Sequence, residues 1–206
     1  MNTAEIRAQL VMAQQQDRML EVYNFNDEED FHIGYVVAID PLFVLLKSID
    51  WDGKISCLIA IRLSSIHKVQ AFTDYLKTVA IKGAVAKKNH YYDIWGIERF
   101  LKQHHYENQS LLKTILTQAQ ALDEAVVIGT RKYKARDEFE GFVNELTPQK
   151  LTLHYYNEHD LSSEWEYDIL LAQVDYVRAF GTQSATTKAV MREVFDDTGE
   201  KWWQKK

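Results

Sequence analysis

The sequence predicts a mainly β protein with helices, of the α+β class, in which two five-stranded small barrels follow one another. The first observation is an internal repeat. The segments that begin at Gly34 and Gly141 share their glycines, prolines and alternating apolar positions at one numbering offset (141 − 34 = 107), and the only two prolines, Pro41 and Pro148, keep that offset. After the next hairpin the offset becomes 108, which indicates one inserted residue in the second copy.

The second observation is that a helical pattern precedes short alternating strands in each copy. We therefore divide the 206 residues into a first repeat (1–70), a helical connector (71–107), a second repeat (108–181) and a C-terminal helix and tail (182–206). The composition, 46% apolar and 26% charged with only 2 prolines and 8 glycines, is typical of a globular chain that folds nearly end to end.

Each repeat is predicted to begin with a helix. Asn2 is a good N-cap with Glu5 three residues later, and Ser110 precedes the second helical stretch. Apolar residues then recur at helical spacing, at Ile6, Leu10 and Ala13 in the first copy and at Leu111, Leu112, Ile115, Leu116 and Ala119 in the second.

Five short strands are expected after each helix. They are predicted at 18–25, 31–39, 42–50, 55–63 and 66–70, and again at 125–131, 138–146, 150–157, 164–172 and 174–180. Asp52-Gly53 predicts a type I′ hairpin turn. The fourth strand of the first copy alternates as a half-buried strand does, with Ile55, Cys57, Ile59, Ile61 and Leu63 on one face. Its counterpart places Trp165, Tyr167, Ile169 and Leu171 inward and Glu164, Glu166 and Asp168 outward.

Three further helices are expected outside the barrels. The first has a stripe of Phe72, Tyr75, Leu76 and Val79 and ends near Gly83, and the second is capped by Asp93 and carries Ile94, Ile97, Phe100 and Leu101. A terminal helix after Gly181 contains Val190, Met191, Val194 and Phe195.

The chain resembles Sm-like proteins, which are small barrels of the SH3-like kind. The first Sm motif is matched in spacing by Gly34, Val36, Ile39, Asp40, Phe43, Leu45 and Leu46, and the second by I-R-L-S-S-I at Ile61–Ile66. The resemblance covers about residues 3–70 well and 110–180 more weakly. It implies two tandem Sm-like barrels.

The same resemblance implies a pocket for an RNA base, built from an asparagine, an arginine and a glycine. Here Val44 and Leu63 replace the asparagine and the glycine, so only Arg62 is kept. The second copy has Leu151, Leu170 and Leu171 at the three positions, and Thr147 replaces the aspartate. Valine lacks the paired hydrogen bonds with which an amide reads a base. The case for RNA binding at the pocket that Sm-like proteins use is therefore weaker.

Two equivalent loops carry opposite charge. The first copy has Asp27, Glu28, Glu29 and Asp30, and the second has Arg131, Lys132, Lys134 and Arg136 around Tyr133. Because Sm-like domains associate head to tail through strand edges, these loops are candidates for complementary self-association. The alternatives are ordinary solvated loops, or an RNA footprint of phosphate contacts plus a stacking ring, which Lys87 and Lys88 would extend.

No catalytic, cofactor or metal site is predicted. His104 and His105 are adjacent and so diverge on a helix, while His154, Glu158, His159 and Asp160 fall on a strand end and hairpin. Cys57 is expected to be a buried structural thiol, and no phosphate-loop, dinucleotide or G-x-S-x-G pattern occurs.

The tail contains two adjacent tryptophans, Trp202 and Trp203. We expect them to dock on the chain's own barrel or helices, and the alternative is a contact with a partner or with another subunit.

The net charge of −6 disfavours broad capture of nucleic acid or anionic membrane, and the N-terminus has neither a signal peptide nor a lipidation motif. We therefore expect a cytoplasmic, non-catalytic binding or scaffold protein that self-associates as a homo-oligomer and contacts a protein partner. The alternative is an RNA-binding Sm-like regulator that uses Arg62 and the basic loops.

Overall fold

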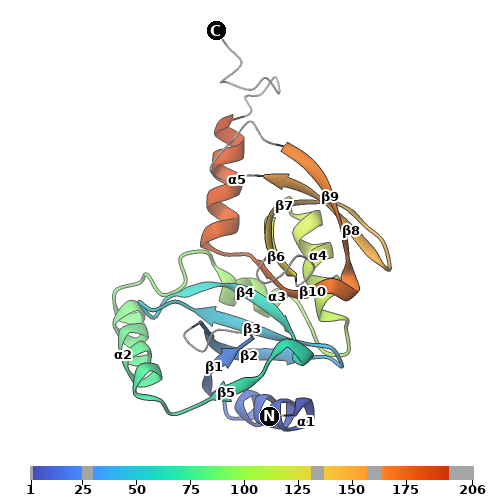
Figure 1. Cartoon of the computed structure of the whole chain (residues 1–206). Helices are drawn as coiled ribbons and strands as arrows, with labels where there is room; N and C mark the ends of the chain where they lie inside the picture. Colours follow the sequence, from blue (N-terminus) through green and yellow to red (C-terminus); the bar gives the residue numbers. More distant parts are fainter. Residues whose placement is uncertain (1, 25–29, 131–136, 157–163, 195–206) are drawn as a thin grey trace.

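The computed structural model describes residues 2–24, 30–130, 137–156 and 164–194. In these ranges the protein is α+β, with five helices and ten strands in one antiparallel sheet that does not close (Figure 1). The helices are α1 (Thr3–Gln15), α2 (Asp74–Lys88), α3 (Ile97–Gln103), α4 (Leu111–Ala121) and α5 (Thr182–Val194). The strands are β1 (Met19–Tyr23), β2 (His32–Ile39), β3 (Phe43–Ile49), β4 (Ile55–Arg62), β5 (Lys68–Gln70), β6 (Ala125–Thr130), β7 (Asp137–Leu146), β8 (Lys150–Tyr156), β9 (Glu164–Leu170) and β10 (Val174–Ala179).

The internal repeat is visible in the topology. The sheet order β5-β1-β2-β3-β4-β10-β6-β7-β8-β9 contains the same five-strand order twice. The register of β2 with β3 shifts between Val36 and Ala38, and that of β7 with β8 shifts between Val143 and Glu145, at the offset of 107 found in the sequence. Such a bulge bends a strand, so both halves curve at the same place.

The first helix of each repeat packs on its own half of the sheet. The predicted capping box is confirmed, because the Asn2 side chain accepts from the Glu5 amide and Glu5 accepts in return from the Asn2 amide. Buried residues of α1 are Ile6, Leu10 and Ala13, and those of α4 are Leu111, Leu112, Ile115, Leu116 and Ala119. Helix α4 contacts β7 of its own repeat and also β3 and β4 of the first.

This double contact of α4 corrects the expectation for the fourth strand. Leu58, Ile59, Ala60 and Ile61 are all fully buried, so β4 is covered on both faces rather than half-buried. Strand β9, which lies at an end of the sheet, is the opposite case. Trp165 was expected inside but is 44% exposed.

Three local expectations are also wrong. The turn at Asp52-Gly53 exists, but only Gly53 has a positive φ (82°), so it is not a type I′ turn. Helix α2 does not end near Gly83 but continues to Lys88. The role of Gly83 is to leave room for the backbone of Gly53, which packs directly against the helix there. The carboxylate of Asp93 accepts from the amides of Ile97 and Glu98. However, α3 begins three residues later than expected, with Gly96 at its N-cap, so Ile94 lies outside the helix and is exposed.

The repeat extends further than the five strands of each half. Helices α2 and α5 begin at Asp74 and Thr182, which keeps the offset of 108. The residues before them read V-Q-A-F and V-R-A-F, and Phe72 and Phe180 both have a left-handed φ, 63° and 58°. Phe72 therefore lies in the link before α2 and not on its apolar stripe.

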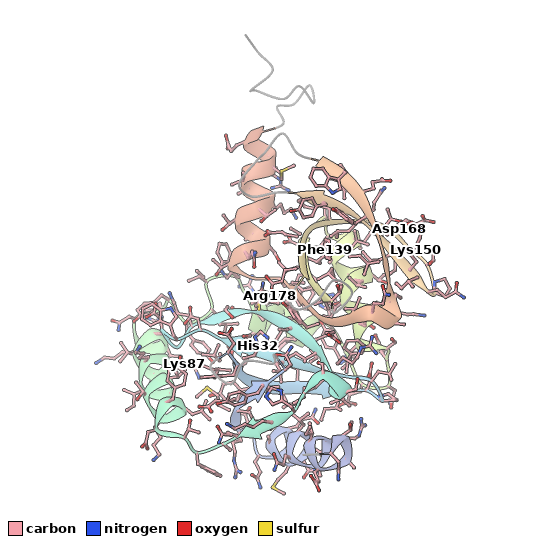
Figure 2. The ribbon with its side chains drawn as sticks, in the orientation of Figure 1. His32, Lys87, Phe139, Lys150, Asp168 and Arg178 are labelled. Carbon is pink, nitrogen blue, oxygen red and sulfur yellow. The ribbon has the colours of Figure 1, made fainter. Side chains whose placement is uncertain are left out.

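His32 on β2 predicts a measurable pH dependence. Burial, with a contribution from Arg178, lowers its pKa to about 3, and Figure 2 labels both residues where the two halves meet. Between pH 3 and about 6.5 the unfolded chain binds more protons at His32 than the folded chain does. The free energy of unfolding is therefore unaffected by this group above pH 6.5 and falls as the pH is lowered through this range.

Replacing His32 tests this pH dependence, and Phe139 at the equivalent position of the second repeat supplies the substitution. Urea unfolding at pH 7 and pH 5 is expected to show wild type losing about 1–2 kcal/mol more than His32→Phe, and equal losses would contradict the assignment.

Candidate interaction surfaces

The two repeats are joined edge to edge by a strand pair. Strands β4 and β10 form an antiparallel ladder in which Ile61 faces Tyr176, and Leu58 faces Ala179. Strand β10 thus links the two halves, since its other edge pairs with β6 of the second repeat. We call this contact the inter-repeat junction.

Arg62 lies in the inter-repeat junction. Its Nε donates to the carbonyl oxygen of Val174 (2.7 Å) and its Nη2 to that of Leu171 (2.8 Å). The guanidinium carbon is 4.7 Å from the ring centroid of Phe43. The residue that the Sm-like resemblance assigned to RNA is therefore engaged in holding the second repeat against the first.

Replacing Arg62 tests this role. Leucine occupies the equivalent position, Leu170, so Arg62→Leu is expected to keep the strand while leaving two carbonyls without their donors, at a cost of about 2 kcal/mol in unfolding free energy. Arg62→Lys should recover only part of this, because lysine lacks the planar fork. Urea unfolding measures both. A stable Arg62→Leu that loses nucleic acid at low salt would instead show an RNA contact.

Asp40 connects the turn between β2 and β3 to the second repeat. Its Oδ1 accepts from the amides of Leu42 and Phe43 (both 2.6 Å), and its Oδ2 accepts from the amide of Leu111 at the start of α4 (2.7 Å). Ser110 makes no side-chain cap there, so this carboxylate replaces the cap expected from the sequence. Thr147, in the second copy, bonds only within its own turn, to Lys150.

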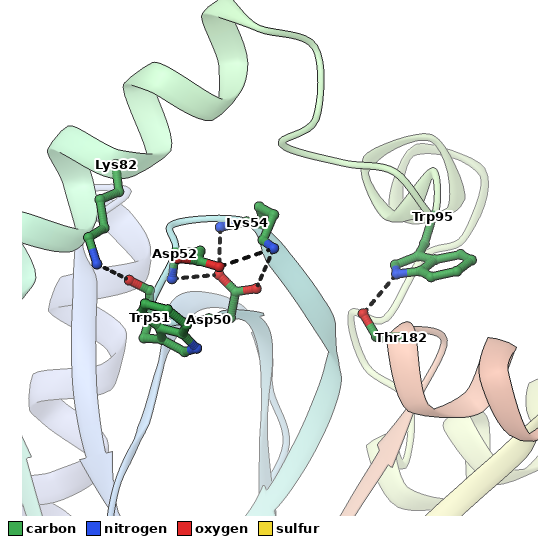
Figure 3. Close-up of polar contacts among 7 residues, drawn as sticks. All are labelled: Asp50, Trp51, Asp52, Lys54, Lys82, Trp95 and Thr182. Carbon is green, nitrogen blue, oxygen red and sulfur yellow. Dashed lines mark hydrogen bonds and ion pairs between the residues drawn. The ribbon is translucent and has the colours of Figure 1, made fainter.

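The end of β10 fits into a socket formed by the connector. Phe180 is 9% exposed, and its ring lies 4.4 Å from that of Phe100, which in turn stacks on His104. Just beyond, the indole nitrogen of Trp95 donates to Thr182 Oγ1 (2.9 Å; Figure 3). The connector therefore contributes an aromatic clamp on the start of α5.

The two outer edges of the sheet are β5 and β9. Beside β5 a groove of about 290 Å³ separates it from α1. Its lining includes Met12, Arg18, Leu20, Val69, Gln70 and Ala71. Phe72 follows β5 and is 69% exposed, with the Arg18 guanidinium 4.0 Å from its ring centroid.

Strand β9, at the other end of the sheet from β5, carries charged side chains. Asp168 is ion-paired with Lys150 (2.8 Å), and Figure 2 labels both residues on the outer part of the second repeat. Glu166 accepts from Asn144 (2.6 Å), and Trp165 stacks on Tyr155.

Most of the candidate contact residues from the sequence lie outside the described residues. These are Asp27, Glu28, Glu29, Arg131, Lys132, Tyr133, Lys134, Arg136, Trp202 and Trp203. Asp30 is exposed, and Lys87 and Lys88 are exposed at the C-terminal end of α2. The ammonium of Lys87 is 4.4 Å from the ring centroid of Tyr92, which is itself buried.

The described residues contain no group of three histidine, cysteine, aspartate or glutamate side chains placed to hold a metal ion. Burial raises the pKa of the Cys57 thiol, which therefore stays protonated near neutral pH. In the same ranges no helix has the length and apolar character needed to cross a membrane.

The sequence analysis did not identify Phe180 or the clamp residue Trp95, and it placed Phe72 on the wrong element, the apolar stripe of α2. The signal was present, because V-Q-A-F and V-R-A-F continue the repeat at the same offset of 108. Comparison of the chain with models of protein families, with curated proteins and with solved structures gave no match.

Proposed function

We propose that the protein is a non-catalytic, cytoplasmic scaffold of two tandem Sm-like barrels, which self-associates through its sheet edges and contacts a macromolecular partner, specifically protein. Each half of the sheet has one strand order, 5-1-2-3-4, with a helix packed on it. That arrangement supports the assignment of each half to a small barrel.

The observation that carries the proposal is the inter-repeat junction. One repeat already binds another by pairing β4 with β10, and the edges equivalent to these two, β9 and β5, lie at the ends of the sheet. Strand edges with unpaired backbone groups are natural sites for further pairing. The two end strands of the sheet, β9 and β5, are therefore equivalent to the two strands that pair in the inter-repeat junction, β4 and β10.

The partner surface is expected on the connector side. Exposed apolar side chains gather along the β3–β4 hairpin, α2 and the link before α3, namely Trp51, Ile81, Val85, Tyr91, Ile94 and Trp95. Lys82 crosses from α2 to the hairpin and donates to the Trp51 carbonyl (Figure 3). Exposed aromatic anchors with adjacent charges are characteristic of protein interfaces.

The second candidate is an RNA-binding regulator, favoured by Lys87 and Lys88 beside exposed Tyr91. Against it, two donors of Arg62 are used by backbone carbonyls of the inter-repeat junction. These contacts support the scaffold over the regulator.

The two candidates separate in one preparation of the full chain. At low salt, the absorbance ratio and end-labelling report bound RNA, and light scattering reports the mass. An assembly without nucleic acid supports the scaffold. RNA that salt releases supports the regulator, since phosphate contacts weaken steeply with salt. A single chain of 24.1 kDa at all concentrations would contradict self-association.

A further inference from the structure

A cavity of the first repeat lies between α2, strands β1 to β3 and Tyr92. Three side-chain donors line it, namely the hydroxyls of Tyr35 and Tyr92 and the ammonium of Lys87. We propose that this cavity binds a small carboxylate whose apolar body is about the size of benzene. No lining residue belongs to either end strand of the sheet, so this small-molecule site is independent of self-association.

The size of the cavity limits the size of the ligand. Its volume is about 130 Å³. The inner wall is mostly apolar and is formed by Met19, Ile49, Gly53, Val79 and Gly83. An apolar protein cavity of about 150 Å³ binds benzene, so a body of similar size fits here. The cavity opens to solvent along α2, where Ala80 and Ala84 line it and are exposed.

Small residues on one face of α2 leave this space. The lining positions of the second half of the helix follow the spacing i, i+3, i+4 and i+7, and they are Ala80, Gly83, Ala84 and Lys87. The hairpin packs directly on this face, since a Cβ on Gly53 would lie 2.3 Å from the Gly83 nitrogen. Lys82 ties the same two elements together by donating to the Trp51 carbonyl (2.9 Å; Figure 3). The cavity is therefore preformed.

Tyr92 is the residue that points to a ligand. It is 7% exposed, and its carbonyl oxygen accepts from the Ile55 amide (2.8 Å), which holds its backbone at the start of β4. Within the described residues its hydroxyl makes no hydrogen bond, and neither does the hydroxyl of Tyr35. A hydroxyl removed from water without a partner is costly, and an acceptor atom on a ligand removes that cost.

Both phenols are donors at neutral pH. Burial, with a contribution from the carboxylate of Asp17, raises the pKa of Tyr35 and that of Tyr92. A protonated phenol donates one hydrogen bond. The two hydroxyls therefore require acceptor atoms on the ligand.

The charge at the cavity favours an anionic acceptor. The ammonium of Lys87, which Figure 2 labels on α2, lies 4.4 Å from the ring centroid of Tyr92 and makes no ion pair with a described residue. Two acids near Tyr92 are already engaged, because Glu98 is paired with Lys47 (3.1 Å) and Asp93 accepts from two amides of α3. A carboxylate accepts from two hydroxyls and an ammonium at once.

The second repeat has a cavity at the equivalent place, but with different lining residues. Phe142 replaces Tyr35 at the offset of 107. Larger side chains replace the small residues of α2 at the offset of 108, namely Lys188, Met191 and Arg192. Lys188 is also paired with Glu124 (2.8 Å). The fold thus leaves a space beside this helix in both repeats, and among the described lining residues only the first repeat supplies tyrosine hydroxyls.

Calorimetric titration of the full chain with benzoate tests the assignment. Benzoate is expected to bind at least about tenfold more tightly than benzylamine, which carries the opposite charge on the same ring. Along acetate, propionate and butyrate, the affinity should rise about fourfold with each methylene that fills the cavity. No binding of benzoate, tighter binding of benzylamine, or equal affinity along the series would overturn the proposal.

Adjacent residues supply matched control variants. Tyr92→Phe and Lys87→Met are each expected to weaken benzoate binding about tenfold or more. Tyr91→Phe and Lys88→Met change side chains that do not line the cavity, and they should bind as wild type does. Equal affinities in the test and control variants would contradict the assignment.

Two further measurements separate binding from folding. Ala84→Leu places a good helix former at an exposed position and fills the cavity mouth, so it should abolish binding without unfolding the chain. Tyr92→Phe should leave urea unfolding of the ligand-free protein unchanged, because its hydroxyl has no partner among the described residues. Undiminished binding in Ala84→Leu, or a loss of stability in Tyr92→Phe, would overturn the site and leave the scaffold proposal standing.

Discussion

Replacing Gly181 with alanine is expected to lower the free energy of unfolding by about 3 kcal/mol, because an added methyl group forces the closely packed strands apart. A Cβ at Gly181 would overlap the carbonyl oxygen of Ser56 and press on Cys57, both at the start of β4. The backbone there cannot move without breaking the ladder with β10. Phe180, immediately before, would also leave its place against Phe100.

Gly96 supplies the control for Gly181. It has a positive φ of 70°, but an added Cβ meets no atom within 4 Å. Gly96→Ala should therefore cost only the backbone strain, about 1 kcal/mol. Urea unfolding of both variants measures the difference. Equal losses would mean that the close approach of the two repeats contributes nothing beyond glycine's flexibility.

Asp40→Ala is expected to lower the free energy of unfolding by a similar amount, about 3 kcal/mol, because three amides lose a charged acceptor in a buried place. Two of them, Leu42 and Phe43, belong to the turn between β2 and β3, and the third, Leu111, begins α4. Thr147→Ala, the matched change in the second repeat, removes only bonds within one turn and should cost about 1 kcal/mol.

Asp40→Thr separates the two roles of this carboxylate. Threonine reproduces the turn of the second repeat, where Thr147 accepts from Lys150, but it cannot also reach α4. An intermediate stability is therefore expected from urea unfolding. If Asp40→Thr is as stable as wild type, the bond to Leu111 does not join the two repeats.

The repeat and its strands could be predicted because they depend on local rules. Alternating apolar residues, a bulge and a turn at each proline recur at one offset, and the described ranges contain the ten strands that were expected. The Asn2–Glu5 capping box likewise depends only on residues within one helical turn. Such features follow from near neighbours along the chain.

The inter-repeat junction could not be predicted, because it depends on residues that are far apart in the chain. The residues near Arg62 in the sequence do not indicate whether its guanidinium donates to the carbonyls of Leu171 and Val174 or contacts RNA. Likewise, both faces of β4 are buried because Leu58 and Ala60 lie in one core cluster with α4 of the other repeat, while Ile59 and Ile61 lie in a second cluster with α1. Phe72 appeared to belong to the α2 stripe because its helical spacing to Leu76 and Val79 is correct, while only its backbone φ excludes it.

Amide hydrogen exchange of the full chain tests the central claim most directly. Every second amide of an edge strand points away from its own sheet, so Lys68–Gln70 and Glu164–Leu170 report whether a partner strand is paired there. We predict that both segments become protected together as the concentration rises, with β4 and β10 protected throughout as the internal reference. Rapid exchange of both end strands in a sample whose mass is oligomeric would contradict the account.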